Sequence, residues 1–246
     1  MPTLLAIETS GETCSAAVFD GAQMVLHSAR VGNAHSEHLL GMVQAVLDRS
    51  DIALAGCDAL AFSAGPGSFT GLRVGCAVAQ GLAFGADLPV VQVGTLIAVA
   101  DSLPREILFC GARIIAAQDA RMGEVYWSAL TWHDDGWRVD VPASLASPIA
   151  LREESFANGG AAFDIGCGNA WAMHGVALGR LAARVVHRDA PDASQIARLG
   201  LLAWQRGEAM AAEAARPEYV RDRVAQTTIE REAARMEKYR ASSETS

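Results

Sequence analysis

The stretch that decides the fold is residues 4–29, LLAIETSGETCSAAVFDGAQMVLHSA. Leu4–Glu8 is a short apolar run that predicts a buried strand, and Cys14–Phe19 and residues 23–29 predict two more strands. Asp20-Gly21 separates the last two runs and is a strong signal for a two-residue hairpin turn. The beginning of the chain is therefore predicted to form three strands that follow one another in antiparallel order.

The pattern continues outward from these strands and then repeats. After them we expect a helix, a strand, a helix, a strand and a helix, at residues 36–50, 59–63, 68–85, 90–93 and 95–103. The second half has the same order, at residues 113–117, 124–131, 137–141, 151–157, 163–166, 170–178, 184–187 and 195–210. Asp135-Gly136 matches Asp20-Gly21, and the acidic residue Asp119 matches Glu8. Two such units predict an α/β protein with two lobes, each a mixed sheet flanked by helices, and a cleft between them.

Composition limits the possible functions. The chain has 246 residues, 51% of them hydrophobic, which is enough for a packed core. With 20 basic and 28 acidic residues its net charge is −8, which disfavours autonomous nucleic-acid binding but not membership of a complex that processes nucleic acid. The five cysteines are scattered without a Cys-x-x-Cys pair, so neither a disulfide framework nor a zinc ribbon is expected. No signal peptide or long apolar span is present, which predicts a cytoplasmic protein without a membrane partner.

The most distinctive motif is Gly65-Pro66-Gly67-Ser68-Phe69-Thr70-Gly71-Leu72-Arg73-Val74-Gly75. A glycine-rich loop that opens a helix can hold phosphate on its free N–H groups, but the spacing fits neither a P-loop nor a dinucleotide fingerprint. Gly67, Gly71 and Gly75 recur every four residues, and glycine inside a helix is unfavourable unless something must approach its backbone closely. That neighbour is either the chain's own sheet or a partner helix.

Two other turns have nucleotide-binding alternatives. Thr9-Ser10-Gly11 follows Glu8 and fits either a phosphate-binding hairpin or an ordinary turn. Gly166-Cys167-Gly168-Asn169 lies where two-lobed ATPases meet adenosine, and is equally compatible with a plain tight turn. His35 and His38 lack a third ligand at useful spacing, so no metal site is predicted.

A further turn, Asp119-Ala120-Arg121-Met122-Gly123-Glu124, contains two carboxylates and a guanidinium. A catalytic pair is conceivable there, but an Asp–Arg pair that orders the turn is the favoured interpretation.

Several motifs in order carry a family resemblance. They are AIETS at residues 6–10, HSEHLL at 35–40, the glycine-rich motif at 65–75, DARMGEVYW at 119–127 and PEYVR at 217–221. Together they resemble the TsaB (YeaZ) family over about residues 3–225. The resemblance implies the actin/sugar-kinase/Hsp70-like (ASKHA) fold. It also implies similarity to TsaD, the subunit that transfers a threonylcarbamoyl group to adenosine 37 of tRNAs that read ANN codons (t6A37).

The resemblance further implies a role as a non-catalytic subunit. Members pair with TsaD as a heterodimer through first-lobe helices, TsaE joins them, and tRNA binds the assembly. A homodimer through the same surface is possible when the chain is alone. Transferred to this sequence, no residue is catalytic, and the partner interface comprises Leu39, Leu40, Val43, Leu47, Gly71, Arg73, Val74, Gly75, Val78 and Leu82.

No cofactor of its own is expected, and ATP or ADP binding is expected to be weak or confined to the complex. A vestigial nucleotide site would comprise Glu8, Thr9, Ser10 and Gly166. The family usually has Asp where this chain has Glu8, and the extra methylene would crowd a metal-bound water. The alternative function is an independent ASKHA-type ATPase or phosphotransferase that uses Glu8, Ser10 and the cleft between the lobes.

The expected division is an N-terminal lobe at residues 1–105, which carries the docking helices, and a C-terminal lobe at 106–216. Residues 217–246 are expected to form a helix and tail that return to the first lobe.

Overall fold

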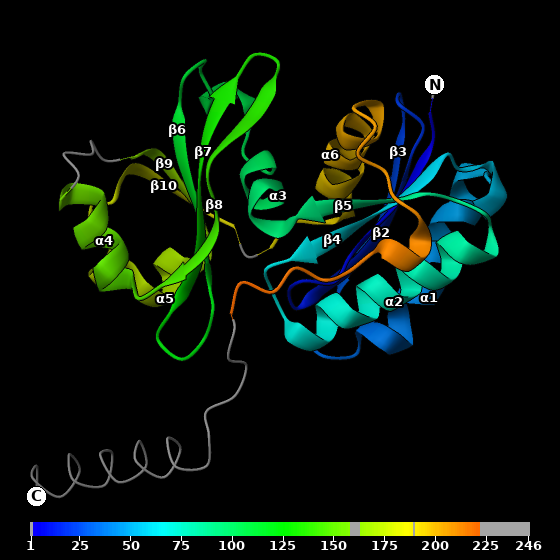
Figure 1. The fold of residues 1–246 in the computed structure, drawn as a ribbon, viewed down its shortest axis with the longest axis horizontal. Coiled ribbons are helices and arrows are strands. Elements are labelled where there is room, and N and C mark those ends of the chain that lie inside the picture. The colour runs from blue at the N-terminus through cyan, green and yellow to red at the C-terminus, as the bar shows by residue number, and fades with distance from the viewer. Residues whose placement is uncertain (1, 158–162, 189, 222–246) are drawn as a thin grey trace, which may run out of the picture.

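The computed structural model describes residues 2–157, 163–188 and 190–221. The first half forms β1 (Leu4–Glu8), β2 (Thr13–Phe19), β3 (Met24–Arg30), α1 (His35–Ser50), β4 (Ala59–Gly65), α2 (Phe69–Gly85), β5 (Val90–Gly94) and α3 (Thr95–Asp101). The second half forms β6 (Arg113–Asp119), β7 (Val125–His133), β8 (Gly136–Ala146), α4 (Pro148–Ala157), β9 (Phe163–Gly168), α5 (Ala170–Leu178), β10 (Ala182–His187) and α6 (Ala193–Gln205). This order matches the predicted repeat, and the two-lobed ASKHA-like α/β fold is confirmed (Figure 1).

The two sheets have the same topology. The strand order is β3-β2-β1-β4-β5 in the first sheet and β8-β7-β6-β9-β10 in the second. In both sheets the hairpin strands pair antiparallel and the remaining strands pair parallel. Both Asp-Gly turns lie at hairpins, between β2 and β3 and between β7 and β8.

The last helix of each half packs on the sheet of the other half. α1 and α2 cover one face of the first sheet, and its other face is covered by α6 from the end of the second half. Correspondingly, α3 packs on the second sheet, whose other face is covered by α4 and α5. α3 and α6 also contact each other. The predicted grouping of residues 106–216 in one lobe therefore needs correction for α6, because its apolar face is buried against the first sheet.

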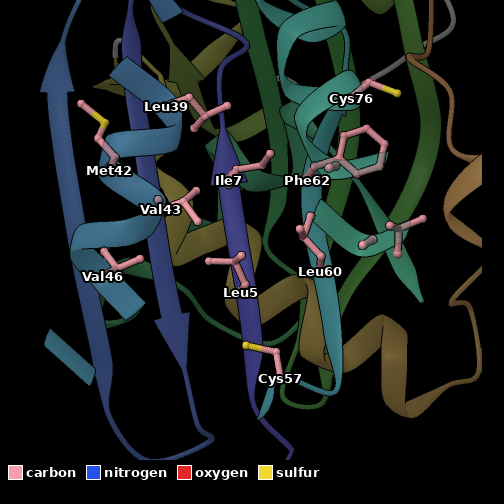
Figure 2. Packing of buried hydrophobic residues seen from close by; sticks show 14 of the residues in the cluster. Leu5, Ile7, Leu39, Met42, Val43, Val46, Cys57, Leu60, Phe62 and Cys76 are labelled. Carbon is pink, nitrogen blue, oxygen red and sulfur yellow. The ribbon is translucent and has the colours of Figure 1, made fainter. Parts of the chain in front are cut away.

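The core beneath α1 and α2 follows from strand alternation. Leu5 and Ile7 of β1 point toward these helices and pack with Leu39 of α1 and Phe62 of β4 (Figure 2). Leu4 and Ala6 point to the opposite face and pack against α6. Because β1 is buried on both faces, its sequence is continuously apolar up to its last residue. Each fully buried leucine of this kind contributes about 2 kcal/mol.

In the described part of the chain, no helix combines the length and the apolar character needed to cross a membrane.

The close packing of α6 on the first sheet depends on Gly200. A Cβ atom there would lie 2.6 Å from the Cβ of Ala61, so we predict that Gly200→Ala lowers the free energy of unfolding by about 1–3 kcal/mol. Gly41 in α1 has open space around it, and Gly41→Ala should instead be neutral or stabilise by up to about 1 kcal/mol. Urea unfolding measures both variants. Equal effects of the two substitutions would contradict the described packing of α6.

Candidate functional site

The polar residues Glu8, Thr9 and Ser10 are buried at the carboxyl end of β1. β1 pairs in parallel with β4, and the loop that leads from β4 into α2 lies against this edge of the sheet. In open α/β sheets ligands bind outside the carboxyl ends of parallel strands, which makes this edge the first place to look for a nucleotide site.

The glycine-rich loop closes over this edge. The N–H group of Ser68 donates a hydrogen bond to the carbonyl of Ser10 (2.7 Å), and the hydroxyl of Thr9 donates to the carbonyl of Gly71 (2.9 Å). A Cβ atom at Gly67 would lie 2.6 Å from the Ser10 oxygen, and one at Gly71 would overlap the Thr9 carbonyl. The backbone of α2 therefore meets the chain's own β1 turn.

This packing corrects part of the predicted partner interface. Gly71 and Gly75 were expected at a partner helix, but both are buried, and a Cβ at either position would collide with Thr9. Of the two interpretations of the glycine repeat, close approach to the chain's own sheet is the one that the structure adopts.

Glu8 occupies the turn that a phosphate would need. Its carboxylate accepts the N–H of Ser10, while its Oε2 atom has no hydrogen-bond partner among the described residues. The side chain is completely buried, and this burial raises the pKa of Glu8 from 4.5 to about 7. The N–H of Thr9 faces the Ser63 hydroxyl at 3.4 Å, so the backbone donors of Thr9 and Ser10 both have partners within the chain.

The predicted adenosine turn in the second lobe is filled by protein. Gly166 lies on the sheet face covered by α5, and a Cβ there would lie 2.6 Å from the ring of Trp171. Gly168 packs on the backbone of Ala117, and the Asn169 side-chain oxygen accepts a hydrogen bond from a backbone N–H of the neighbouring strand. The side of Gly166 on which a Cβ would project is therefore occupied by the protein itself.

The turn between β6 and β7 is ordered by partners other than the predicted one. Asp119 contacts Nε2 of His174 at 2.8 Å instead of pairing with Arg121. Glu124 pairs with Arg221 at 2.7 Å, and the same guanidinium donates to a backbone carbonyl of the turn. Arg221 belongs to the PEYVR motif, so this motif reaches the second lobe. Sequence spacing could not reveal the pairing, because the two partners are almost a hundred residues apart.

Residues 210–221 follow α6 and are called the strap below. The strap also contacts the first turns of α2. Nε of Arg73 donates to the Tyr219 hydroxyl (2.8 Å), and the Arg73 guanidinium lies 3.7 Å from the ring centroid of Phe69. Arg73 remains exposed, as expected of an interface residue, but it is held by the chain's own residues.

The residues predicted for the partner interface are not, for the most part, the residues on the outer face of α1 and α2. Five of the ten expected interface residues are buried inside the chain: Leu39, Val43, Leu47, Gly71 and Gly75. Apolar residues at helical spacing mark the face that packs on the helix's own sheet, so the pattern identified the core face. Leu40 is 54% exposed, and Val74, Val78 and Leu82 are partly exposed. Phe84, which the sequence analysis missed, is 79% exposed near the end of α2.

The described residues can also be compared with the ligand sets that metal ions require. Across residues 2–157, 163–188 and 190–221, no group of three or more His, Cys, Asp or Glu side chains is placed to hold a metal ion. Four of the five cysteines are buried, whereas Cys110 is exposed.

The buried carboxyl of Glu8 predicts a specific pH dependence of stability. Its folded-state pKa of about 7 lies above its ordinary value of 4.5, so the folded state holds a proton that the unfolded state releases between these pH values. Stability is therefore lost as pH rises from 4.5 to 7. Glu8→Gln should stabilise the protein above pH 7 by up to about 3 kcal/mol and change little below pH 4.5.

Urea unfolding at several pH values measures this difference, with Glu12→Gln at an exposed site as the matched control. Parallel pH profiles for Glu8→Gln and the unmodified chain would contradict the assignment.

Comparison with known proteins places this geometry in a family. The model of the family described as TsaD, tRNA N6-adenosine threonylcarbamoyltransferase, matches residues 29–229. The tRNA threonylcarbamoyladenosine biosynthesis protein TsaB of Escherichia coli K12 is 36% identical over 229 residues, which cover 90% of this chain and 96% of the relative. TsaB of Haemophilus influenzae is 45% identical over 126 residues, covering 51% of this chain and 52% of the relative. The structure of YeaZ from Pseudomonas aeruginosa superposes with a TM-score of 0.80 at 35% identity, covering 89% of this chain and all of that one. The chain belongs to the TsaB (YeaZ) family.

Proposed function

We propose that this chain acts in the biosynthesis of threonylcarbamoyladenosine in tRNA, as a non-catalytic partner that docks on the transferase TsaD. The relatives are named for this pathway, and the family model that matches most of the chain is that of the transferase. The observation that carries the non-catalytic part is the closed turn at the end of β1, where Glu8 takes the N–H of Ser10 and the start of α2 packs on Thr9.

This closed turn argues against an independent ATPase or phosphotransferase. Phosphoryl transfer is catalysed mainly by positioned N–H donors, cationic side chains and metal ions around the phosphates. Here the N–H groups of Thr9 and Ser10 have partners within the chain. A phosphate could reach them only if Gly67 separated from Ser10, which would break the hydrogen bond between Ser68 and Ser10. We therefore expect ATP or ADP to bind at most within the assembled complex.

The docking surface that we propose consists of two exposed apolar side chains on α1 and α2, Leu40 and Phe84, and three partly exposed ones, Val74, Val78 and Leu82. The two helices lie side by side on the outer face of the first sheet (Figure 1). Burying an exposed Leu or Phe side chain contributes about 1.5–3 kcal/mol, so this set can anchor an interface. Gly41 and Gly81 on the same helices have open space where a side chain would be, which permits a partner helix to come close.

The proposed mechanism is structural. Docking of α1 and α2 would hold TsaD in a competent conformation, and TsaE would join this heterodimer in the cytoplasm. The net charge of −8 makes this chain a poor surface for tRNA by itself, so tRNA would bind the assembly. Without TsaD, the same exposed face would allow two copies of the chain to associate.

Leu40→Glu tests the docking surface. A charge in the centre of an apolar interface should weaken the complex with cognate TsaD by about 30-fold or more, the effect typical of a hot spot. Light scattering coupled to size-exclusion chromatography measures the complex, and a reconstituted t6A assay should show a parallel loss. Leu40 is largely exposed in the free chain, so its unfolding transition should change little.

The matched control is Val176→Glu on α5, at a side chain that is 97% exposed on the second lobe. It should leave the complex intact. Equal loss in both variants, or full binding by Leu40→Glu, would contradict the proposed surface. Metal-dependent ATP turnover by the chain alone would favour the independent enzyme.

A further inference from the structure

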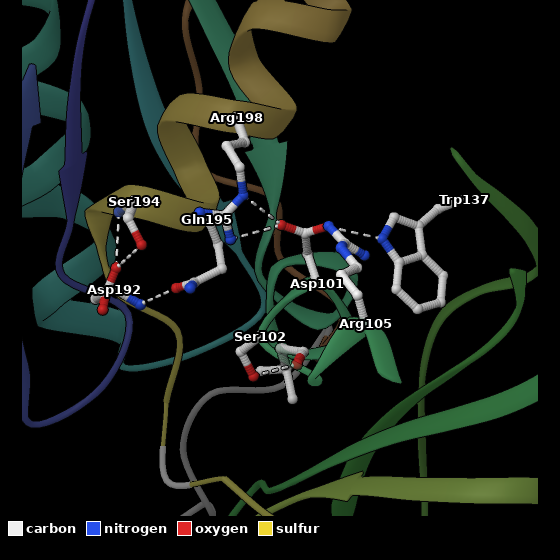
Figure 3. Close-up of polar contacts among 9 residues, drawn as sticks. Asp101, Ser102, Arg105, Trp137, Asp192, Ser194, Gln195 and Arg198 are labelled. Carbon is white, nitrogen blue, oxygen red and sulfur yellow. Dashed lines mark hydrogen bonds and ion pairs between the residues drawn. The ribbon is translucent and has the colours of Figure 1, made fainter. Parts of the chain in front are cut away.

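A buried carboxylate lies where the two halves of the chain exchange helices. Asp101, the last residue of α3, has only 4% of its side chain exposed. Its Oδ2 accepts hydrogen bonds from Nε and a terminal nitrogen of Arg198 on α6, at 3.2 and 3.0 Å (Figure 3). Its Oδ1 accepts from Arg105 at 2.6 Å and from the indole N–H of Trp137 on β8 at 3.0 Å.

These partners connect both sheets through one side chain. α3 packs on the second sheet, α6 packs on the first, and Trp137 belongs to a strand of the second sheet. The Trp137 ring is packed against the cores on both sides, beneath α6 and beneath α3. It also meets Trp132 edge-on at 4.8 Å, and the Arg105 guanidinium lies 4.6 Å from the Trp132 ring. Relative motion of the lobes would therefore have to separate Asp101 from Arg198, and Trp137 from the core beneath α6.

The strap forms a second connection between the lobes. The N–H of Glu218 donates to the carbonyl of Ala64 in the first sheet (2.8 Å). Three residues later, Arg221 pairs with Glu124 in the turn between β6 and β7 of the second sheet. A short extended segment is thus fixed to one lobe at one end and to the other lobe at the other end.

We propose that Asp101, with Arg198 and Trp137, is an interlobe latch that, together with the strap, holds the two lobes at one fixed angle. Removing a partner from a buried carboxylate leaves an uncompensated charge, which is strongly unfavourable. Hinge motion that pulled α6 away from α3 would remove Arg198 from the buried carboxylate of Asp101. The chain is then a rigid body that offers its partner surface in one shape, and nucleotide does not drive closure of its lobes. The latch itself does not depend on the proposed function, whereas the use of a fixed shape for docking rests on that function.

The distance between spin labels on the two lobes tests the latch. Labels at Gln44→Cys on α1 and Val176→Cys on α5, in a Cys110→Ser background, leave only buried native cysteines. Pulsed electron resonance should give one narrow distance distribution for the otherwise unmodified chain, and added Mg-ATP should not shift it. Arg198→Gln removes the charge from the α6 side and should broaden the distribution by about twofold or split it, as expected for released hinge motion.

Two further variants keep the test decisive. Trp137→Phe removes the indole donor and part of the packed ring but leaves both arginine partners of Asp101 in place, so it should broaden the distribution less than Arg198→Gln does. Arg206→Gln just beyond the end of α6 breaks an exposed ion pair with Glu208 and should have no effect. A broad or ATP-shifted distribution in the unmodified chain would overturn the proposal even if a latch variant failed to fold. A distribution that stays narrow in folded Arg198→Gln would overturn the role of Asp101.

Discussion

The packing of the start of α2 on the end of β1 is the contact on which both the architecture and the proposed function depend. Backbone meets backbone here without room for a Cβ, at Gly67 against Ser10 and at Gly71 against Thr9. Hydrogen bonds between the same segments fix the helix relative to the strand. The packing therefore closes the turn where a phosphate would bind, and it also orients the outer face of α2 toward solvent.

Closing the turn buries the carboxyl group of Glu8, which is unfavourable for its charged form. A carboxyl group without solvent prefers its neutral form, and its second oxygen has no hydrogen-bond partner among the residues that the structure describes. The same side chain, by taking the Ser10 N–H, replaces the interaction that a phosphate would make. The scaffold keeps its two-lobed architecture with this turn filled by its own residues, which supports the docking role proposed above.

Much of the fold could be predicted from the sequence because its signals are local. The two Asp-Gly turns and the apolar runs beside them define matching hairpins, and the observed strand orders confirm the repeat. The exchange of α3 and α6 between the halves could not be predicted, since it depends on which sheet has room for each helix. Asp101 is marked in the sequence, because it is an acidic residue that directly follows the apolar run 96–100 at the end of α3.

The candidate site was predicted less well for a physical reason. Helical periodicity identified Leu39 and Val43 correctly as one face of α1, but that face packs on the chain's own sheet. The docking surface that we propose is on the opposite face, where isolated apolar residues such as Leu40 and Phe84 have no periodic pattern to mark them. The sequence also could not show which neighbour the glycine repeat faces. A strand of the same chain and a helix of a partner both require glycine where they approach the helix backbone closely.

We propose that this chain presents a docking face and has no working nucleotide site of its own. Hydrogen exchange measured on the chain alone, with Mg-ATP, and with cognate TsaD tests both parts in one experiment. We expect TsaD to slow exchange in α1 and α2, whereas Mg-ATP alone should change nothing at residues 8–11. Protection of residues 8–11 by Mg-ATP in the isolated chain, with α1 and α2 unaffected by TsaD, would contradict it.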